Sequence, residues 1–119
     1  MKIGIVDTSA FIAEKNILDM MVDDFDGIFI PQTVINELNN YKDKYEWVEP
    51  CLTKIQEMVG CGKVMVTPGS GIADRDIAAA AMIAKMEGTA CIIHGMSFFN
   101  PPCHNIKVCS VNNYLKNRI

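Results

Sequence analysis

Short, almost continuously apolar segments alternate along the chain with longer segments whose apolar residues recur every three or four positions. Short apolar runs are typical of strands buried on both faces of a parallel sheet, and the longer spacing is typical of helices with one buried face. The pattern predicts strands at residues 2–6 and in the segments GIFIP, KVMVTP, TACIIHG and IKVCSV.

Helices are predicted between and after these strands, at residues 9–24, PQTVINELNNYK, residues 45–59, ADRDIAAAAMIAKMEG and VNNYLKN. We expect the first helix to break near Lys15 and Asn16. Pro31 suits the first turn of the second helix, because proline has no N–H to donate there. Gly88 is expected to end the alanine-rich helix, which has the strongest helical pattern in the chain.

This order of elements predicts the fold class and the domain organisation. Strands that alternate with helices indicate a parallel sheet covered on both faces. We therefore predict an α/β fold, a three-layer α/β/α sandwich around a small central parallel sheet of four or five strands. A chain of 119 residues, half of them apolar, is expected to form a single domain over residues 1–119.

Charge and hydropathy narrow the partners. The net charge of −3 argues against capture of nucleic acid by a broad basic surface. No apolar run approaches the roughly 18 residues of a membrane span, and the start of the chain lacks the pattern of a signal peptide. The five cysteines are scattered without a pairing pattern, and we expect them to be reduced. We expect a cytoplasmic protein with no membrane partner.

The candidate chemistry lies in acids placed where strands end or helices begin. Asp7 follows the first strand directly, and a carboxylate there must be solvated, hydrogen-bonded or bound to a cation. Glu37 lies on the flank of the apolar stripe of its helix and can reach the edge of the sheet, although an ordinary surface glutamate has the same pattern. Asp74 and Asp76 are about 200° apart around the alanine-rich helix, so only one of them can face such a site, and either can be a helix cap.

The segments IVDTSAFI, PQTVINEL and DRDIAAAAMIAKMEG occur in this order, and with them the chain resembles the PIN domain family along essentially its whole length. PIN domains are metal-dependent ribonucleases found among the toxins of toxin–antitoxin pairs and among RNA-processing enzymes. The resemblance implies Asp7, Glu37 and Asp76 as metal ligands and catalytic residues, with Asp74 as the alternative to Asp76.

The resemblance also implies the cofactor and the partners. Thr8 or Ser9 would form hydrogen bonds beside the metal. The carboxylates would hold Mg²⁺ or Mn²⁺, which prefer oxygen ligands and can activate water for the hydrolysis of an RNA phosphodiester. A homodimer, and an antitoxin or another protein partner, are further expectations of this kind.

One motif of the family is missing. PIN domains usually carry a fourth acid after the strand that follows the alanine-rich helix, but this chain has His94, Gly95 and Met96 there, and no acid follows Glu87. His94 could supply a nitrogen ligand, which would favour transition metals over magnesium, or it could be a hydrogen-bonded histidine at a strand end. The alternative function is therefore a catalytically impaired PIN-like domain that acts as an RNA-binding or protein-interaction module.

Two other predictions concern apolar residues. Phe98 and Phe99 can stack on RNA bases or pack against the core or a partner. The core is expected to take up most methionines, namely Met20, Met21, Met58, Met82, Met86 and Met96.

A different fold family, the phosphoacceptor receiver domain, also places an aspartate at the end of a strand. It would need a pair of acids near the start of the chain, where this chain has only Asp7.

Overall fold

Strands and helices alternate along the chain in the predicted order. The computed structural model describes residues 1–95 and 106–118. Within these residues the strands are β1 (Lys2–Val6), β2 (Gly27–Pro31), β3 (Val64–Thr67), β4 (Thr89–His94) and β5 (Lys107–Ser110). The helices are α1 (Thr8–Ala13), α2 (Ile17–Asp24), α3 (Gln32–Asn40), α4 (Val48–Gly60), α5 (Ala73–Glu87) and α6 (Val111–Asn117).

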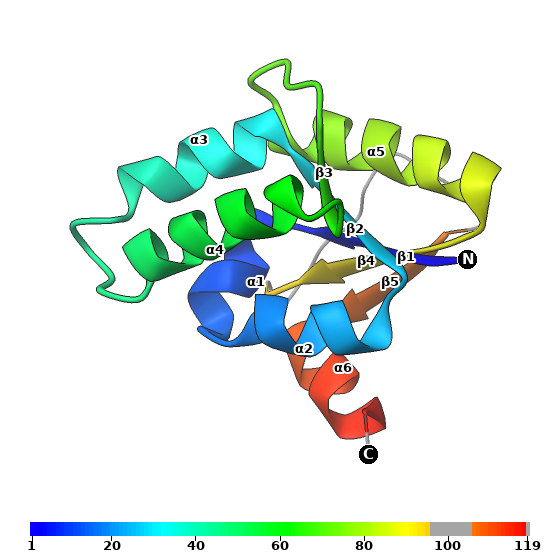
Figure 1. The fold of residues 1–119 in the computed structure, drawn as a ribbon, viewed down its shortest axis with the longest axis horizontal. Helices are drawn as coiled ribbons and strands as arrows, with labels where there is room; N and C mark the ends of the chain where they lie inside the picture. Colours follow the sequence, from blue (N-terminus) through cyan, green and yellow to red (C-terminus); the bar gives the residue numbers. More distant parts are fainter. Residues whose placement is uncertain (96–105, 119) are drawn as a thin grey trace.

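All five strands form one parallel sheet in the order β3-β2-β1-β4-β5. Helix α5 covers one face of this sheet, and α2 and α6 lie on the other (Figure 1). The predicted fold class is confirmed: helices flank a single parallel sheet, as in a three-layer α/β/α sandwich. Because β1 is the central strand, its side chains from Ile3 to Val6 are almost completely buried.

The break predicted in the first helix is confirmed. Helix α1 ends at Ala13, and α2 begins at Ile17. Glu14 turns the chain between them, because its carboxylate accepts a hydrogen bond of 3.2 Å from the amide of Asn16. The carboxylate of Glu14 therefore replaces the backbone carbonyl that an uninterrupted helix would offer to the amide of Asn16.

The prediction that Pro31 lies in the first turn of α3 is wrong. It is the last residue of β2 and the N-cap of α3, with a φ of −62° and a ψ of 144°. The ring of proline sets φ near −65° in helices and in extended chain alike, so it is ψ that decides between them. The third predicted helix also begins later than expected, at Val48, because residues 41–47 form turns.

Methionine burial is only partly as predicted. Met21 is buried, but Met82 and Met86 on α5 are 52% and 88% exposed. The small side chains of α5, such as Ala80, Ala81 and Ala84, face the sheet instead. Helix α5 therefore packs closely against the strands through alanine and points its larger residues outward. None of the helices in the described part of the chain combines the length and the apolar character needed to cross a bilayer.

Candidate functional site

The parallel sheet brings the predicted site residues to one edge. Asp7 follows β1, Glu37 lies on the helix after β2, Asp76 lies on the helix after β3, and His94 ends β4. In a parallel sheet the carboxyl ends of all strands meet at the same edge, where sites commonly form. The three acids and the histidine therefore reach one side of the molecule from four different strands.

Asp7 is a buried carboxylate, 5% exposed, at the N-cap position of α1. Its amide donates a hydrogen bond of 3.0 Å to the carbonyl of Ile93, which fastens the end of β1 to β4. The hydroxyl of Ser9 donates to Oδ2 of Asp7 over 2.6 Å and accepts from the amide of Gly95 over 2.9 Å. Ser9 thus links the Asp7 carboxylate to the residue that follows β4.

Glu37 is held by the neighbouring hydroxyl. The side chain of Thr8, which is buried, donates to Oε1 of Glu37 over 2.6 Å. The first turn of α1 therefore contacts both acids, Asp7 through Ser9 and Glu37 through Thr8. A hydroxyl that donates to a carboxylate fixes the orientation of that carboxylate, and this is the auxiliary role expected of Thr8 and Ser9.

A pocket of about 530 Å³ opens beside this pair of hydroxyls. Thr8, Ser9, Glu37 and Gly95 line one part of it. The other part is lined by residues of α1 and of the segment after α3, namely Ile12, Ala13, Tyr41, Lys44 and Tyr45. Tyr41, Lys44 and Tyr45 were not among the predicted site residues. The sequence does show two tyrosines four residues apart soon after Glu37, and this pattern could have indicated them.

Asp76 faces inward and Asp74 faces solvent. Asp76 is 5% exposed, whereas Asp74 is exposed. The two carboxylates thus lie in different surroundings, as their spacing around the helix predicts, and Asp76 is the buried one. The prediction that Asp74 is the helix cap is wrong, because the N-cap position belongs to Ile72 and Asp74 is the second residue of α5.

The carboxylate of Asp76 organises the loop before α5. It accepts three hydrogen bonds, from the hydroxyl of Thr33 (2.5 Å), from the amide of Ser70 (2.8 Å) and from the hydroxyl of Ser70 (2.7 Å). Burial raises the pKa of Asp76, but the hydrogen bonds from Thr33 and Ser70 outweigh burial and lower the pKa below its ordinary value. Glycine suits position 69 of this loop, because a Cβ there would lie only 2.6 Å from Oγ1 of Thr33.

We expect Asp76→Ala to lower the free energy of unfolding by about 1–3 kcal/mol, because it leaves the buried hydroxyl of Thr33 without its acceptor and removes two hydrogen bonds from Ser70. Asp76→Asn keeps one acceptor oxygen and should cost less. Because folding lowers the pKa of Asp76 from 3.8, its charge stabilises the fold fully above that value. This contribution is lost as the pH falls through the pKa of the folded state.

Urea unfolding of the wild type and Asp76→Asn at a series of pH values measures this contribution. The difference between the two proteins should shrink on acidification below about pH 4. A difference that stays constant over the acidic range would contradict the role given to the charge of Asp76.

Asp7 and Glu37 are the two acids at this edge that could hold a metal ion. In residues 1–95 and 106–118, no three His, Cys, Asp or Glu side chains form a group that could hold a metal ion. Asp76 is directed to its own loop, while Asp7 and Glu37 are both bonded to the Thr8–Ser9 pair. Mg²⁺ is commonly bound by one or two carboxylates together with several waters, so the chemistry of these two donors fits such an ion.

His94 and Gly95 occupy the place of the missing acid. His94 is buried at the end of β4 and is in register with Ser110 of β5. A Cβ at Gly95 would overlap the carbonyl oxygen of Ser9 and lie 2.8 Å from Cβ of Ala13. The backbone after β4 therefore approaches α1 too closely for an aspartate at residue 95. Met96, Phe98 and Phe99 lie outside the described residues.

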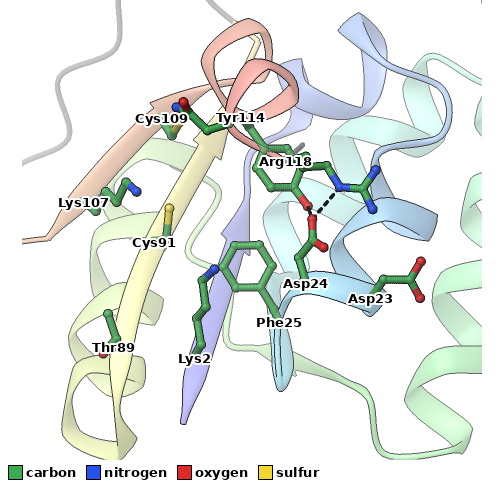
Figure 2. Close-up of a pocket in the computed structure, with 11 residues that line it drawn as sticks. Lys2, Asp23, Asp24, Phe25, Thr89, Cys91, Lys107, Cys109, Tyr114 and Arg118 are labelled. Carbon is green, nitrogen blue, oxygen red and sulfur yellow. Dashed lines mark hydrogen bonds and ion pairs between the residues drawn. The ribbon is translucent and has the colours of Figure 1, made fainter.

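A second pocket, of about 490 Å³, lies at the opposite, amino-terminal end of the strands (Figure 2). Its lining includes Lys2, Cys91 and Lys107 from three strands, and Tyr114 and Arg118 near the end of the chain (Figure 2). Burial raises the pKa of Cys91 to about 11, so its thiol is protonated at neutral pH and is a poor nucleophile.

The charges around this second pocket serve to attach α6. Tyr114 and Arg118 both donate to Oδ2 of Asp24 over 2.5 Å (Figure 2). Burial raises the pKa of Asp24, but these two hydrogen bonds outweigh burial and lower it. The ring of Tyr114 also lies 6.1 Å from that of Phe25. The contacts of Asp24 thus hold the last helix against the end of α2.

No protein-family model matches the chain, and no curated protein matches it in sequence. The function therefore has to follow from the acids, the hydroxyls and the pocket at the carboxyl edge of the sheet.

Proposed function

We propose that the protein is a PIN-type ribonuclease that depends on Mg²⁺ or Mn²⁺ and hydrolyses RNA phosphodiesters, as a toxin or as an RNA-processing enzyme. The observation that carries this proposal is the pairing of Asp7 and Glu37 with the adjacent hydroxyls of Ser9 and Thr8, beside a pocket at the carboxyl edge of the sheet. A buried carboxylate that is oriented in this way is suited to hold a hard cation.

Each residue at this edge has its own part in the proposed reaction. Asp7 and Glu37 would hold the ion, which supplies an activated water and neutralises charge on the phosphate. Ser9 and Thr8 keep the two carboxylates in a fixed orientation, so little reorganisation is needed when substrate arrives. The resemblance also implies Asp76 as a third ligand, and in that role its carboxylate would have to give up its hydrogen bonds from Ser70.

Incubation of the purified protein with RNA tests the proposal directly. We expect cleavage in the presence of Mn²⁺ or Mg²⁺ and none in the presence of a chelator. If RNA stays intact with either ion, the proposed activity is wrong.

Glu37→Gln is expected to weaken Mn²⁺ binding by at least about tenfold, because it removes one of two negative charges and one strong oxygen ligand. Isothermal titration calorimetry measures the change. Glu57→Gln is the matched control, since Glu57 is exposed on α4 and does not line this pocket. Equal affinity in wild type and Glu37→Gln would exclude Glu37 as a ligand.

A catalytically impaired PIN-like module is the second candidate function, and the close approach of Gly95 to Ser9 favours it, because it leaves no room for an acid at residue 95. Such a protein would bind RNA or a protein partner without cutting RNA. In both versions the resemblance extends the proposal to a cytoplasmic homodimer, with an antitoxin or another protein as partner.

A further inference from the structure

We infer that Tyr41, Lys44 and Tyr45 form a binding site for the bases and backbone of single-stranded RNA, which we call the tyrosine strip. The inference deepens the proposed function and rests on it, because it places the RNA substrate next to Glu37. Four observations support the strip: its local geometry, its contact with α1, the pocket that it shares with Glu37, and the charge of Lys44.

The local geometry brings the two tyrosines together. Helix α3 ends at Asn40, and the carbonyl of Tyr41 then accepts hydrogen bonds of 3.0 Å from the amides of both Lys44 and Tyr45. This tight turn places the ring centroids of Tyr41 and Tyr45 6.0 Å apart at an angle of 48°. Tyr41 is 37% exposed, so part of its ring is available to a ligand.

The strip contacts α1, the helix whose hydroxyls bind the carboxylates of Asp7 and Glu37. The ring of Tyr45 packs against that of Trp47, with centroids 4.9 Å apart. The indole N–H of Trp47 donates to the carbonyl of Phe11 in α1 over 3.1 Å. The turn of the strip is therefore linked, through Trp47, to the short helix that carries Thr8 and Ser9.

The strip and the Glu37 carboxylate line the same pocket. Tyr41, Lys44 and Tyr45 line the pocket of about 530 Å³ together with Thr8 and Glu37. A ligand that fills this pocket can contact both the tyrosine rings and the Glu37 carboxylate. A nucleotide has both kinds of group, because its base can stack on a ring while its phosphate meets a cation held by carboxylates.

The charge of the strip agrees with RNA as the occupant. The ammonium of Lys44 lies 5.4 Å from the ring centroid of Tyr45, and Lys44 is exposed. A lysine beside aromatic rings combines attraction of phosphate with stacking of bases on the rings, which is the combination used by proteins that bind single strands. The protein as a whole is acidic, so this local arrangement, rather than the net charge, would attract RNA.

The test is the binding of a fluorescein-labelled oligoadenylate, followed by anisotropy in a chelating buffer in which no cleavage can occur. We expect Tyr41→Leu to raise Kd by about tenfold or more, because stacking contributes about 1–3 kcal/mol per base. Tyr41→Phe is the matched control and should bind like the wild type, since it keeps the ring. Thermal melting should show the same Tm for both variants, because Tyr41 is largely outside the core.

Trp47 gives a second readout that reports location. It is the only tryptophan of the chain and it packs on Tyr45, so oligoadenylate at the strip should change its emission. Equal Kd values for the wild type and Tyr41→Leu, or no binding by the wild type, would overturn the inference. The first of these results would leave the strip as a contact for a protein partner.

The proposed nuclease activity and the tyrosine strip can be tested separately. Weaker binding by Tyr41→Leu without any cleavage by the wild type would support the strip and count against the nuclease. Cleavage together with unchanged binding by Tyr41→Leu would support the nuclease and overturn the strip.

Discussion

Asp7→Asn is expected to reduce metal-dependent RNA cleavage by about a hundredfold or more and to leave the fold as stable as the wild type, or more stable. A metal ion contributes several kcal/mol of charge stabilisation in the transition state, and each 1.4 kcal/mol is a factor of about ten in rate. The asparagine would keep the oxygen that accepts from Ser9, but it would lose the charge that attracts the ion.

The stability measurement separates a catalytic role from a structural one. Asp7 is 5% exposed, and a buried charge costs free energy, so its removal should not lower Tm. Cleavage rates and thermal melts of the two proteins, measured at the same Mn²⁺ concentration, provide both numbers. Cleavage at the wild-type rate, or a large drop in Tm, would show that Asp7 is not kept for metal binding.

Gly95→Asp is expected to lower the free energy of unfolding by about 2–3 kcal/mol and to leave metal affinity no better than in the wild type. The new Cβ would overlap the carbonyl oxygen of Ser9, and backbone atoms of a packed helix cannot move aside cheaply. If α1 shifts, Ser9 also loses its hydrogen bond from the amide of residue 95 and holds Asp7 less well.

Urea unfolding with Gly95→Ala and Gly60→Ala as companions measures the steric part. Gly95→Ala carries the same Cβ without a charge and should account for most of the loss. Gly60 has no atom within 4 Å of an added Cβ, so Gly60→Ala should be neutral or slightly stabilising. A Gly95→Asp variant that is as stable as the wild type and binds Mn²⁺ more tightly would contradict this account.

The elements that could be predicted well from the sequence are those determined by local pattern. The alanine-rich segment forms α5 from Ala73 to Glu87, and the last helix occupies the predicted seven residues. The break between α1 and α2 also follows from residues close to it in sequence, because Glu14 and Asn16 bond to one another.

The parts that could not be predicted depend on contacts between distant residues. Thr33 and Asp76 are 43 residues apart, and only the fold shows that a threonine on α3 directs the acid of α5 toward the loop. The exposure of Met82 and Met86 has the same origin, because the sheet accepts the alanine face of α5 and not its methionines. Helical spacing identifies an apolar stripe but not the partner that will cover it.

The bond between Gly95 and Ser9 joins residues 86 positions apart, and it has a consequence for how the protein becomes active. Strand β1 is made first during synthesis, but its neighbour β4 follows only after α5, so the carboxyl edge is completed late. Parallel pairings of such large sequence separation have a high contact order and form slowly. A nascent chain that stops before β4 carries Asp7 without the carbonyl of Ile93 that fixes its backbone. We expect the surroundings of Asp7 to form only after β4 has left the ribosome.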